Sequence, residues 1–311
     1  MTRNHGKIYD SILDTVGATP LVRLPRITQG MPSDLVYKLE FFNPIASVKD
    51  RIAIAMVEQL EESGQLKPGG TIVEPTSGNT GIGVAFAAAA KGYKAILVMP
   101  EQMSIERRKM MKLLGAELVL TEAAGGIPGA MKKAEEIIAA TPGAVQAGQF
   151  TNPANPEMHY RTTGPEIWAD TNGQVDALIA GVGTGGTLTG TARFLKEKNP
   201  DIQILAVEPE GSPMISEGEK GPHKIQGIGA GFIPDVLDTD LIDDVVKISN
   251  DAAFGTAKHV AAEDGVPVGI SSGAAIAASL TVGARPDMHG KRIVTIIPSF
   301  AERYLSTALF D

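Results

Sequence analysis

The sequence predicts an α/β fold with two series of parallel strands covered by helices. Within residues 71–147, and again within 176–297, short apolar runs alternate with helix-length amphipathic or Ala-rich segments. Strands that alternate with helices of this length are typical of βαβ units and a parallel sheet. Residues 148–175 separate the two series and are rich in Asn, Pro, Thr and Gly, so we expect a seam between two domains there. The length of 311 residues also suggests about two domains.

The first half of the chain is expected to contain most of one sheet. The helix at 47–64 has the clearest pattern, because Ser47 and Asp50 have the spacing of a capping box and an apolar stripe follows at helical period. The other expected elements are a short helix at 8–16, strands at 20–24 and 35–40, a strand at 71–74, a helix at 79–91, a strand at 94–99, a helix at 104–114, a strand at 117–120, a helix at 127–140 and a weak strand at 144–147.

The second half is expected to build the other sheet, with glycine and proline marking the ends of its elements. Its expected elements are helical pieces around 157–160 and 164–170, a strand at 176–180, a helix at 187–198, a strand at 203–208, a Gly-rich connection at 221–231, a strand at 244–248, helices at 251–264 and 273–283, and a strand at 292–297.

Composition excludes several classes of function. The net charge of −8 opposes binding to nucleic acids, which requires a basic surface. The absence of cysteine excludes disulfides, thiolate catalysis and cysteine-type zinc sites, and the five histidines show no metal-ligand spacing. The N-terminus leads into no apolar signal segment, and the apolar runs are too short for a membrane span. We therefore expect a soluble, cytoplasmic protein without a metal site.

Lys49 is the first candidate for a catalytic group. It lies in the first turn of the helix expected at 47–64, where the positive end of the helix dipole disfavours an ammonium group. A neutral amine is what a nucleophilic or Schiff-base lysine requires. A solvated lysine between Asp50 and Arg51 is the alternative interpretation of this segment.

Three loops rich in glycine and hydroxyl side chains follow expected strands and begin helices. Open α/β sheets bind ligands at this end of the strands, and helix N-termini attract anions. The loop at 76–81 and the loop at 269–275 are each equally consistent with helix capping or ligand binding. The loop at 181–187 is a stronger candidate for a phosphate cradle, because glycine permits close approach of the backbone.

The loop at 181–187 also admits a second interpretation. Gly181, Gly183 and Gly186 fit the G-x-G-x-x-G fingerprint of dinucleotide-binding proteins, and Glu208 ends the next expected strand. An NAD-dependent oxidoreductase is therefore a competing function from another class. The hydroxyls of Thr184 and Thr187 favour a terminal phosphate instead.

Taken together, four motifs resemble the cysteine synthase (O-acetylserine sulfhydrylase) family of pyridoxal-phosphate enzymes, which have the tryptophan-synthase-β fold type. The motifs are N-P-x-x-S-V-K-D-R at 43–51, T-S-G-N-T-G at 76–81, G-T-G-G-T at 183–187 and G-I-S-S-G at 269–273, and the resemblance covers nearly the whole chain. It implies two open, twisted, mostly parallel sheets with flanking helices, known as PLP fold type II. It further implies a smaller N-terminal domain at 42–152 with a mobile part near 92–136, and a larger cofactor-binding domain formed by 10–41 and 153–311.

The resemblance also implies a pyridoxal 5'-phosphate site and gives individual residues their roles. Lys49 matches the catalytic lysine that holds the cofactor and then acts as a base. Asn79 matches the residue at the cofactor's ring hydroxyl, and Ser271 the residue at its pyridine nitrogen. The residues that match the phosphate loop are Gly183, Thr184, Gly185, Gly186 and Thr187. The residues that match the substrate-carboxylate site are Thr76, Ser77, Thr80 and Gln149, and Gly227 belongs to the loop at the mouth of the site.

The implied activity is a β-replacement that converts O-acetyl-L-serine and sulfide to L-cysteine and acetate through an aminoacrylate intermediate. Cystathionine β-synthase and O-phosphoserine sulfhydrylase are alternatives within the same fold type. Phosphoserine is the less expected donor, because no extra basic residue is evident near the substrate loops. The implied partners are a second copy of the chain and the C-terminal tail of serine acetyltransferase.

Two segments depart from the family pattern. Ile45-Ala46 replaces a smaller or polar pair such as Ala-Asn or Ser-Gly and adjoins the catalytic lysine, so we expect it to bear on donor preference or loop packing. Residues 298–301 read Pro-Ser-Phe-Ala, where the family usually has Asp-Phe-Gly or Ser-Ser-Gly.

Overall fold

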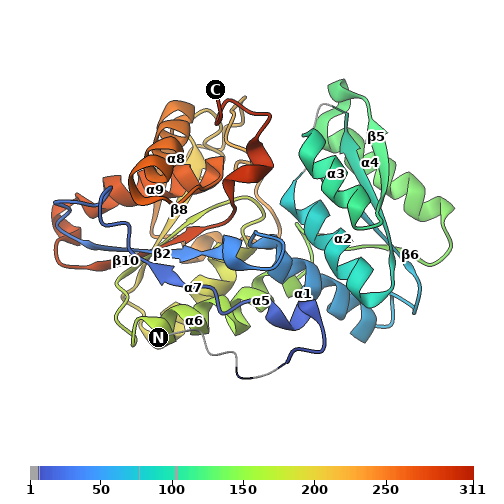
Figure 1. The fold of residues 1–311 in the computed structure, drawn as a ribbon, viewed down its shortest axis with the longest axis horizontal. Helices are drawn as coiled ribbons and strands as arrows, with labels where there is room; N and C mark the ends of the chain where they lie inside the picture. The colour runs from blue at the N-terminus through green and yellow to red at the C-terminus, as the bar shows by residue number, and fades with distance from the viewer. Residues whose placement is uncertain (1–5, 7, 77, 102–103) are drawn as a thin grey trace.

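In a computed structural model of the chain, two sheets stand side by side and helices cover both of them (Figure 1). The structure describes residues 6, 8–76, 78–101 and 104–311. The larger sheet has the strand order β1-β2-β10-β7-β8-β9, and the smaller one β5-β4-β3-β6. Within the described residues, only the pairing of β1 with β2 is antiparallel. The predicted fold class, two open and mostly parallel sheets, is confirmed.

The smaller sheet is formed by one continuous part of the chain. Its elements are α1 (Lys49–Glu62), β3 (Thr71–Pro75), α2 (Asn79–Lys91), β4 (Lys94–Pro100), α3 (Ile105–Leu113), β5 (Glu117–Thr121), α4 (Gly126–Ala140) and β6 (Ala144–Gln146). Helix α2 packs closely on α1 because it is built from small residues: a Cβ atom on Gly83 would lie 2.9 Å from the Lys49 carbonyl oxygen. This close contact brings the beginning of α1 to the carboxyl end of the sheet.

The larger sheet combines strands from both ends of the chain. Its strands are β1 (Leu21–Val22), β2 (Asp34–Leu39), β7 (Ala177–Gly181), β8 (Gln203–Pro209), β9 (Asp244–Ile248) and β10 (Arg292–Ile297). Its helices are α5 (Ala154–Arg161), α6 (Thr163–Asp170), α7 (Gly186–Lys198), α8 (Asn250–Asp264) and α9 (Ile270–Gly283).

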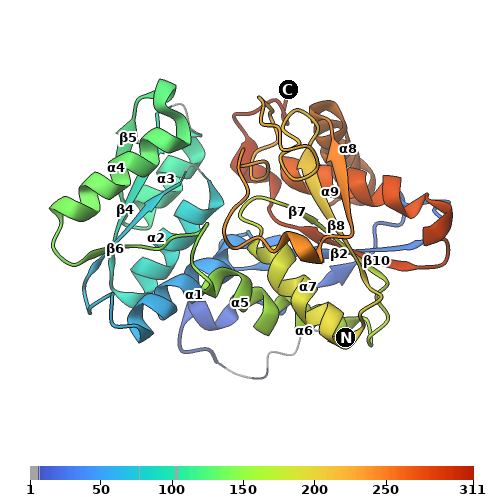
Figure 2. The ribbon, with the colours of Figure 1, turned by 180° about the vertical axis from the view of Figure 1, so that it is seen from behind.

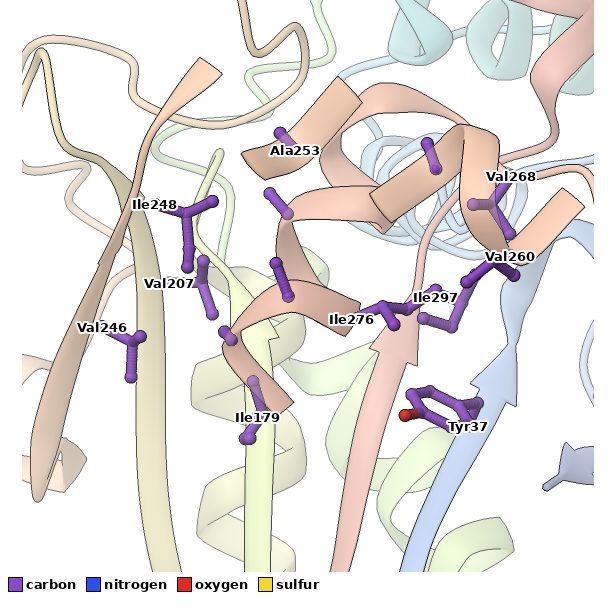
Figure 3. Packing of buried hydrophobic residues seen from close by; sticks show 14 of the residues in the cluster. Tyr37, Ile179, Val207, Val246, Ile248, Ala253, Val260, Val268, Ile276 and Ile297 are labelled. Atoms are coloured by element: carbon purple, nitrogen blue, oxygen red, sulfur yellow. The ribbon is translucent and has the colours of Figure 1, made fainter. Parts of the chain in front are cut away.

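The core of the larger sheet lies on both of its faces. Helices α8 and α9 cover one face, where Ile276 and Val260 pack against strand residues such as Tyr37, Ile179 and Ile297 (Figure 3). Helices α6 and α7 cover the other face (Figure 1). Seen from behind, α5 lies between the two sheets, in contact with both α1 and α7 (Figure 2).

The expected elements are present, and their ends shift most where proline or serine is dense. The expected helix at 8–16 is a single 3₁₀ turn at Ile12–Thr15. The piece expected at 157–160 extends back to Ala154, because Pro153 and Pro156 lie at positions that need no intrahelical N–H bond. Helix α9 begins at Ile270, three residues before the expected start at Gly273, since its buried first turn accommodates the two serines.

The predicted capping box at Ser47 and Asp50 is wrong. The Ser47 hydroxyl accepts the Lys49 N–H (3.2 Å), and the Asp50 carboxylate reaches back to accept the N–H of Ile45 (2.6 Å). Helix α1 therefore begins at Lys49 rather than at Ser47. The polar side chains stabilise the turn before the helix, and Lys49 becomes the first helical residue.

This turn contains Ala46, one of the residues that depart from the family pattern. Ala46 has a φ of 52°, a left-handed conformation that glycine or asparagine adopts at lower cost. We expect Ala46→Gly to raise the free energy of unfolding by about 0.5–1 kcal/mol in urea titrations. Ala87→Gly, in the buried interior of α2, is the matched control and should destabilise the protein. Equal losses in the two variants would contradict the assignment of strain to position 46.

Candidate active site

A cavity of about 580 Å³ lies where the two sheets face each other, and side chains from both line it. Nearly all of the predicted site residues meet there, although they come from distant parts of the chain. Those that line the cavity are Lys49, Thr76, Asn79, Thr80, Gln149, Gly183, Thr184, Gly185, Thr187, Gly227 and Ser271. Gly186 lies directly behind this lining as the first residue of α7. Ser77 lies outside the described residues.

Lys49 enters the cavity from the first position of α1. Burial lowers the pKa of its amine from 10.5 to about 8, and this effect outweighs the attraction of Glu40. Lys49 forms no ion pair with a described residue. A substantial fraction of the amine is therefore neutral near physiological pH, as a nucleophile or base requires.

A buried ion network holds the beginning of α1 in place. The Arg51 guanidinium donates to both carboxylate oxygens of Glu40 (2.7 and 2.9 Å) and to both oxygens of Glu166 on α6. Lys38 on β2 also contacts Glu166 (2.8 Å). Burial alone would raise the pKa of Glu40, but Arg51 and Lys38 hold it at about 2. This network has no signature in the sequence, because its members are spread from β2 to α6.

The loop before α7 is shaped so that only glycine fits at its critical positions. A Cβ atom at Gly183 would lie 2.3 Å from the Gly227 carbonyl oxygen, and one at Gly186 would lie 1.9 Å from Asn155 Oδ1. Gly185 has a φ of 87°. The loop therefore runs close to the cavity at the positive end of α7, where a phosphate group is favoured. This arrangement fits the phosphate of the predicted cofactor.

His159 supports this loop, although the sequence did not predict a role for it. Its Nε2 lies 3.1 Å from the hydroxyl of Thr187, and its Nδ1 lies 2.8 Å from the hydroxyl of Thr163. Burial, reinforced by the Arg51 charge, lowers the pKa of His159 to about 3. The ring stays neutral and fixes the position of Thr187. A lone histidine on a short helix carries no signal that would have revealed this.

Two of the predicted substrate-carboxylate residues, Thr80 and Gln149, are joined by a hydrogen bond. The Thr80 hydroxyl, on α2, donates to Oε1 of Gln149 (2.6 Å), which lies in the loop after β6. Behind them, the carboxylate of Glu74 accepts the main-chain N–H groups of Gly148 (2.9 Å) and Gln149 (3.3 Å). Burial raises the pKa of Glu74 to about 7. Glu74, which the sequence did not single out, thus fixes the turn that carries Gln149.

Asn79 and Ser271 present uncharged polar groups to the same cavity. Asn79 Oδ1 accepts from Arg303 Nη1 (2.8 Å), so the amide nitrogen of Asn79 is the atom left for a ligand. The Ser271 hydroxyl forms no hydrogen bond to any described residue. Both positions therefore fit the heteroatoms of a pyridine ring carrying a hydroxyl group. Arg303 is a further support that the roles assigned from the sequence did not include.

The expectation of no basic residue near the substrate loops is wrong. Arg107 on α3 is buried, lines the cavity and lies with its guanidinium 5.0 Å from the centre of the Tyr304 ring. Its Nη1 would be 3.9 Å from a Cβ atom at Gly78. Sequence distance concealed it, because α3 follows the substrate loop only after a complete helix and strand. A positive charge is therefore present on the substrate side of the cavity.

The dinucleotide interpretation of the loop at 181–187 is not supported by Glu208. Its carboxylate accepts the N–H groups of Ile215 (2.7 Å) and Ser216 (3.1 Å) and the Ser216 hydroxyl (2.5 Å). The carboxylate that would bind a ribose therefore already accepts hydrogen bonds from the segment that follows β8.

Among the described residues, no helix is long and apolar enough to cross a membrane, and no cluster of His, Asp or Glu is placed to hold a metal ion.

Replacement of Gly183 tests the shape of the phosphate loop. We expect Gly183→Ala to weaken binding of pyridoxal phosphate to the apoprotein roughly tenfold to 100-fold, because forcing a methyl group against a carbonyl costs about 1–3 kcal/mol. The control is Gly255→Ala on α8, where a Cβ atom would meet nothing within 4 Å. Fluorescence titration measures both, and unchanged affinity in Gly183→Ala would show that the close contact is unimportant.

Comparison with known proteins finds similarity over nearly the whole chain. The family model described as pyridoxal-phosphate dependent enzyme matches residues 12–299. The chain is 53% identical to a cysteine synthase from Staphylococcus aureus strain N315 over 98% of both chains. Among solved structures, a cysteine synthase from Entamoeba histolytica has a TM-score of 0.96 at 46% identity and covers 100% of this chain and 93% of its own. A hydrogen sulfide-producing enzyme from Fusobacterium nucleatum has a TM-score of 0.92 at 42% identity, with 96% and 100% covered.

Proposed function

This chain belongs to the pyridoxal-phosphate dependent enzyme family, and we propose that it catalyses the cysteine synthase reaction. O-Acetyl-L-serine and sulfide are the substrates, and L-cysteine and acetate are the products. The observation that carries the proposal is the arrangement within one cavity: a lysine without an ion pair, a glycine cradle at a helix N-terminus and a neutral serine. The full-length similarity to cysteine synthases supports this choice of reaction.

The residues present fit pyridoxal 5'-phosphate. The loop at 183–187 would hold the phosphate, the amide nitrogen of Asn79 would meet the ring hydroxyl, and Ser271 would meet the pyridine nitrogen. Lys49 would bond to the aldehyde carbon. When bound, the cofactor supplies an electron sink that stabilises negative charge at the α-carbon of an amino acid.

The protein itself contributes proton transfer and orientation. Lys49 would take the α-proton of the substrate, and its lowered pKa matches that task near neutral pH. Thr76, Thr80 and Gln149, with the N-terminus of α2, orient the substrate carboxylate. Ser271 offers a neutral hydroxyl where a carboxylate would enforce a protonated ring, and this favours loss of the β-substituent over transamination. Ser77 keeps its predicted role at the carboxylate.

The pH dependence of cofactor uptake follows from Lys49. Its pKa is lowered from 10.5 to about 8 by burial, so the neutral amine becomes abundant as pH rises through 8. We expect the rate of cofactor uptake by the apoprotein to rise with pH, with a midpoint near that value. The unfolded chain keeps the ordinary pKa, so this group also makes the apoprotein more stable as pH rises from 8 to 10.5.

Stopped-flow absorbance measures the uptake. Ser271→Ala serves as the control, because it removes a ring contact without changing the burial of the amine, and the midpoint should stay where it is. A rate that does not change across this pH range would contradict the assignment to Lys49.

Donor specificity tests the proposed reaction directly. The purified enzyme is supplied with sulfide and either O-acetylserine, O-phosphoserine or serine, and with serine plus homocysteine. We expect O-acetylserine to give the highest kcat/KM. Because the Arg107 guanidinium lines the cavity, O-phosphoserine is the second candidate donor. A preference for serine plus homocysteine would replace our proposal with a cystathionine β-synthase activity.

The remaining expectations from the sequence are proposals of the same kind. We place the domain division at 42–152 against 10–41 and 153–311, with the part near 92–136 moving when substrate binds. The separate sheets support this division, because β3 to β6 all lie within the smaller unit. A homodimer and docking of the serine acetyltransferase tail rest on the family resemblance, whereas a cytoplasmic location is proposed from the lack of long apolar runs in the sequence. Light scattering and peptide competition with O-acetylserine test the first two.

A further inference from the structure

The side chain of Asn155 joins two segments that reach the cavity from different sheets. It is fully buried in the first turn of α5. Its Nδ2 donates to the main-chain oxygen of Gln149 (2.8 Å) and to the hydroxyl oxygen of Thr184 (3.0 Å). Gln149 follows β6 of the smaller sheet, whereas Thr184 follows β7 of the larger one. One amide group therefore contacts both the substrate side and the phosphate side.

The chemistry of its partners determines how this amide is oriented. A main-chain carbonyl oxygen can only accept, so the atom next to Gln149 must be the Asn155 nitrogen. The second hydrogen of that nitrogen then points at Thr184 and makes its oxygen an acceptor. The hydroxyl hydrogen of Thr184 remains available, and the Thr184 side chain lines the cavity. Asn155 thereby presents Thr184 as a donor toward a ligand.

The other end of the amide argues against a purely structural role. Asn155 Oδ1 is buried and has no hydrogen-bond partner among the described residues. It lies against Gly186, where an added Cβ atom would approach to 1.9 Å. A buried oxygen without a donor is unfavourable. The contribution of Asn155 is therefore the pair of hydrogen bonds that its Nδ2 donates to Gln149 and Thr184.

We propose that Asn155 is a positioning residue that presets the Thr184 hydroxyl as a donor to an anionic group and ties the phosphate loop to the turn carrying Gln149. This inference rests on the proposed function, because the anionic group is the phosphate of the cofactor. Helix α5 is suited to the task, since it packs against both α1 and α7 (Figure 2).

Variants at the two positions test the proposal together. Asn155→Ala removes both hydrogens, Thr184→Val removes the hydroxyl, and the double variant shows whether the two effects act through one another. The control is Asn152→Ala, because the Asn152 amide is also buried and donates to the Ala147 oxygen (3.0 Å) but forms no hydrogen bond to Thr184. The readouts are the thermal midpoint, the Kd of the apoprotein for pyridoxal phosphate, and the ³¹P chemical shift of the bound phosphate.

We expect Asn155→Ala and Thr184→Val each to weaken cofactor binding about tenfold to 100-fold, as for loss of a hydrogen bond to a charged group. In the Thr184→Val background, Asn155→Ala should change the Kd less than about threefold. The ³¹P shift should move in both single variants, while Asn152→Ala should change the thermal midpoint without moving the shift.

Three results would overturn the proposal: an Asn155→Ala protein that binds cofactor as the parent does, effects that multiply fully in the double variant, or an equal loss of affinity in Asn152→Ala. If Asn155→Ala does not fold, Asn155→Leu, which keeps a branched side chain but has no donor, takes its place in the same cycle. A parent protein that binds no pyridoxal phosphate would instead refute the proposed function, so the two failures are distinguishable.

Discussion

Lys49→Ala is expected to abolish the β-replacement activity while leaving the fold intact. In the proposed reaction the amine bonds the cofactor and moves the α-proton. Loss of such a general base lowers rates on the order of 10²- to 10⁴-fold, before the loss of cofactor bonding is counted. The side chain lies at the first position of α1 and makes no ion pair with a described residue, so its removal disturbs little packing. Steady-state turnover of O-acetylserine with sulfide measures the effect.

A chemical test identifies the lysine independently of turnover. Borohydride reduction of the loaded parent enzyme should add the mass of the cofactor to the peptide that contains Lys49, and the Lys49→Ala protein should gain no such mass. Lys224→Ala, at an exposed lysine on the mouth of the same cavity, is the matched control and should be labelled as the parent is. Labelling at a different lysine would refute the assignment.

Arg51→Met is expected to lower the free energy of unfolding by about 3–5 kcal/mol, because it leaves a buried carboxylate without its partner. Arg51 and Glu40 are 1% and 0% exposed, and two hydrogen bonds of 2.7 and 2.9 Å join them. Glu166 keeps Lys38 as a partner and is less affected. Chemical denaturation of the apoprotein measures the loss without interference from cofactor binding.

The matched comparison is an ion pair on the surface. Arg161→Met breaks an exposed pair with Glu157, in which the side chains are 58% and 43% exposed, and should cost less than about 1 kcal/mol. The double variant Glu40→Gln with Arg51→Met should recover part of the stability, since no buried charge is left alone. Similar losses for Arg51→Met and Arg161→Met would show that the buried network adds little.

The pattern of apolar runs, glycines and hydroxyl side chains was sufficient to predict much of this protein. Strands and helices in both sheets followed from periodicity, because local backbone preferences and burial agree there. The loop at 183–187 was also recognisable, since close backbone approach and a left-handed residue both require glycine. Lys49 was a candidate from its place at a helix start, but a solvated lysine remained the alternative there, and the predicted cap was wrong.

Only the tertiary structure decided which polar groups support the site. Glu74, Asn155 and His159 lie in separate segments, and their roles arise from contacts with residues far away in the chain. No basic residue was expected near the substrate loops, but α3 packs against α2 and brings Arg107 to the cavity. Ala46 departs from the family pattern, and its φ of 52° shows that this departure also affects the conformation of the backbone. The sequence by itself determined the elements, because these depend on local spacing, and the resemblance of its motifs supplied the residues proposed for the site. Their partners and charges depend on burial and long-range contacts, which exist only once the two sheets have come together.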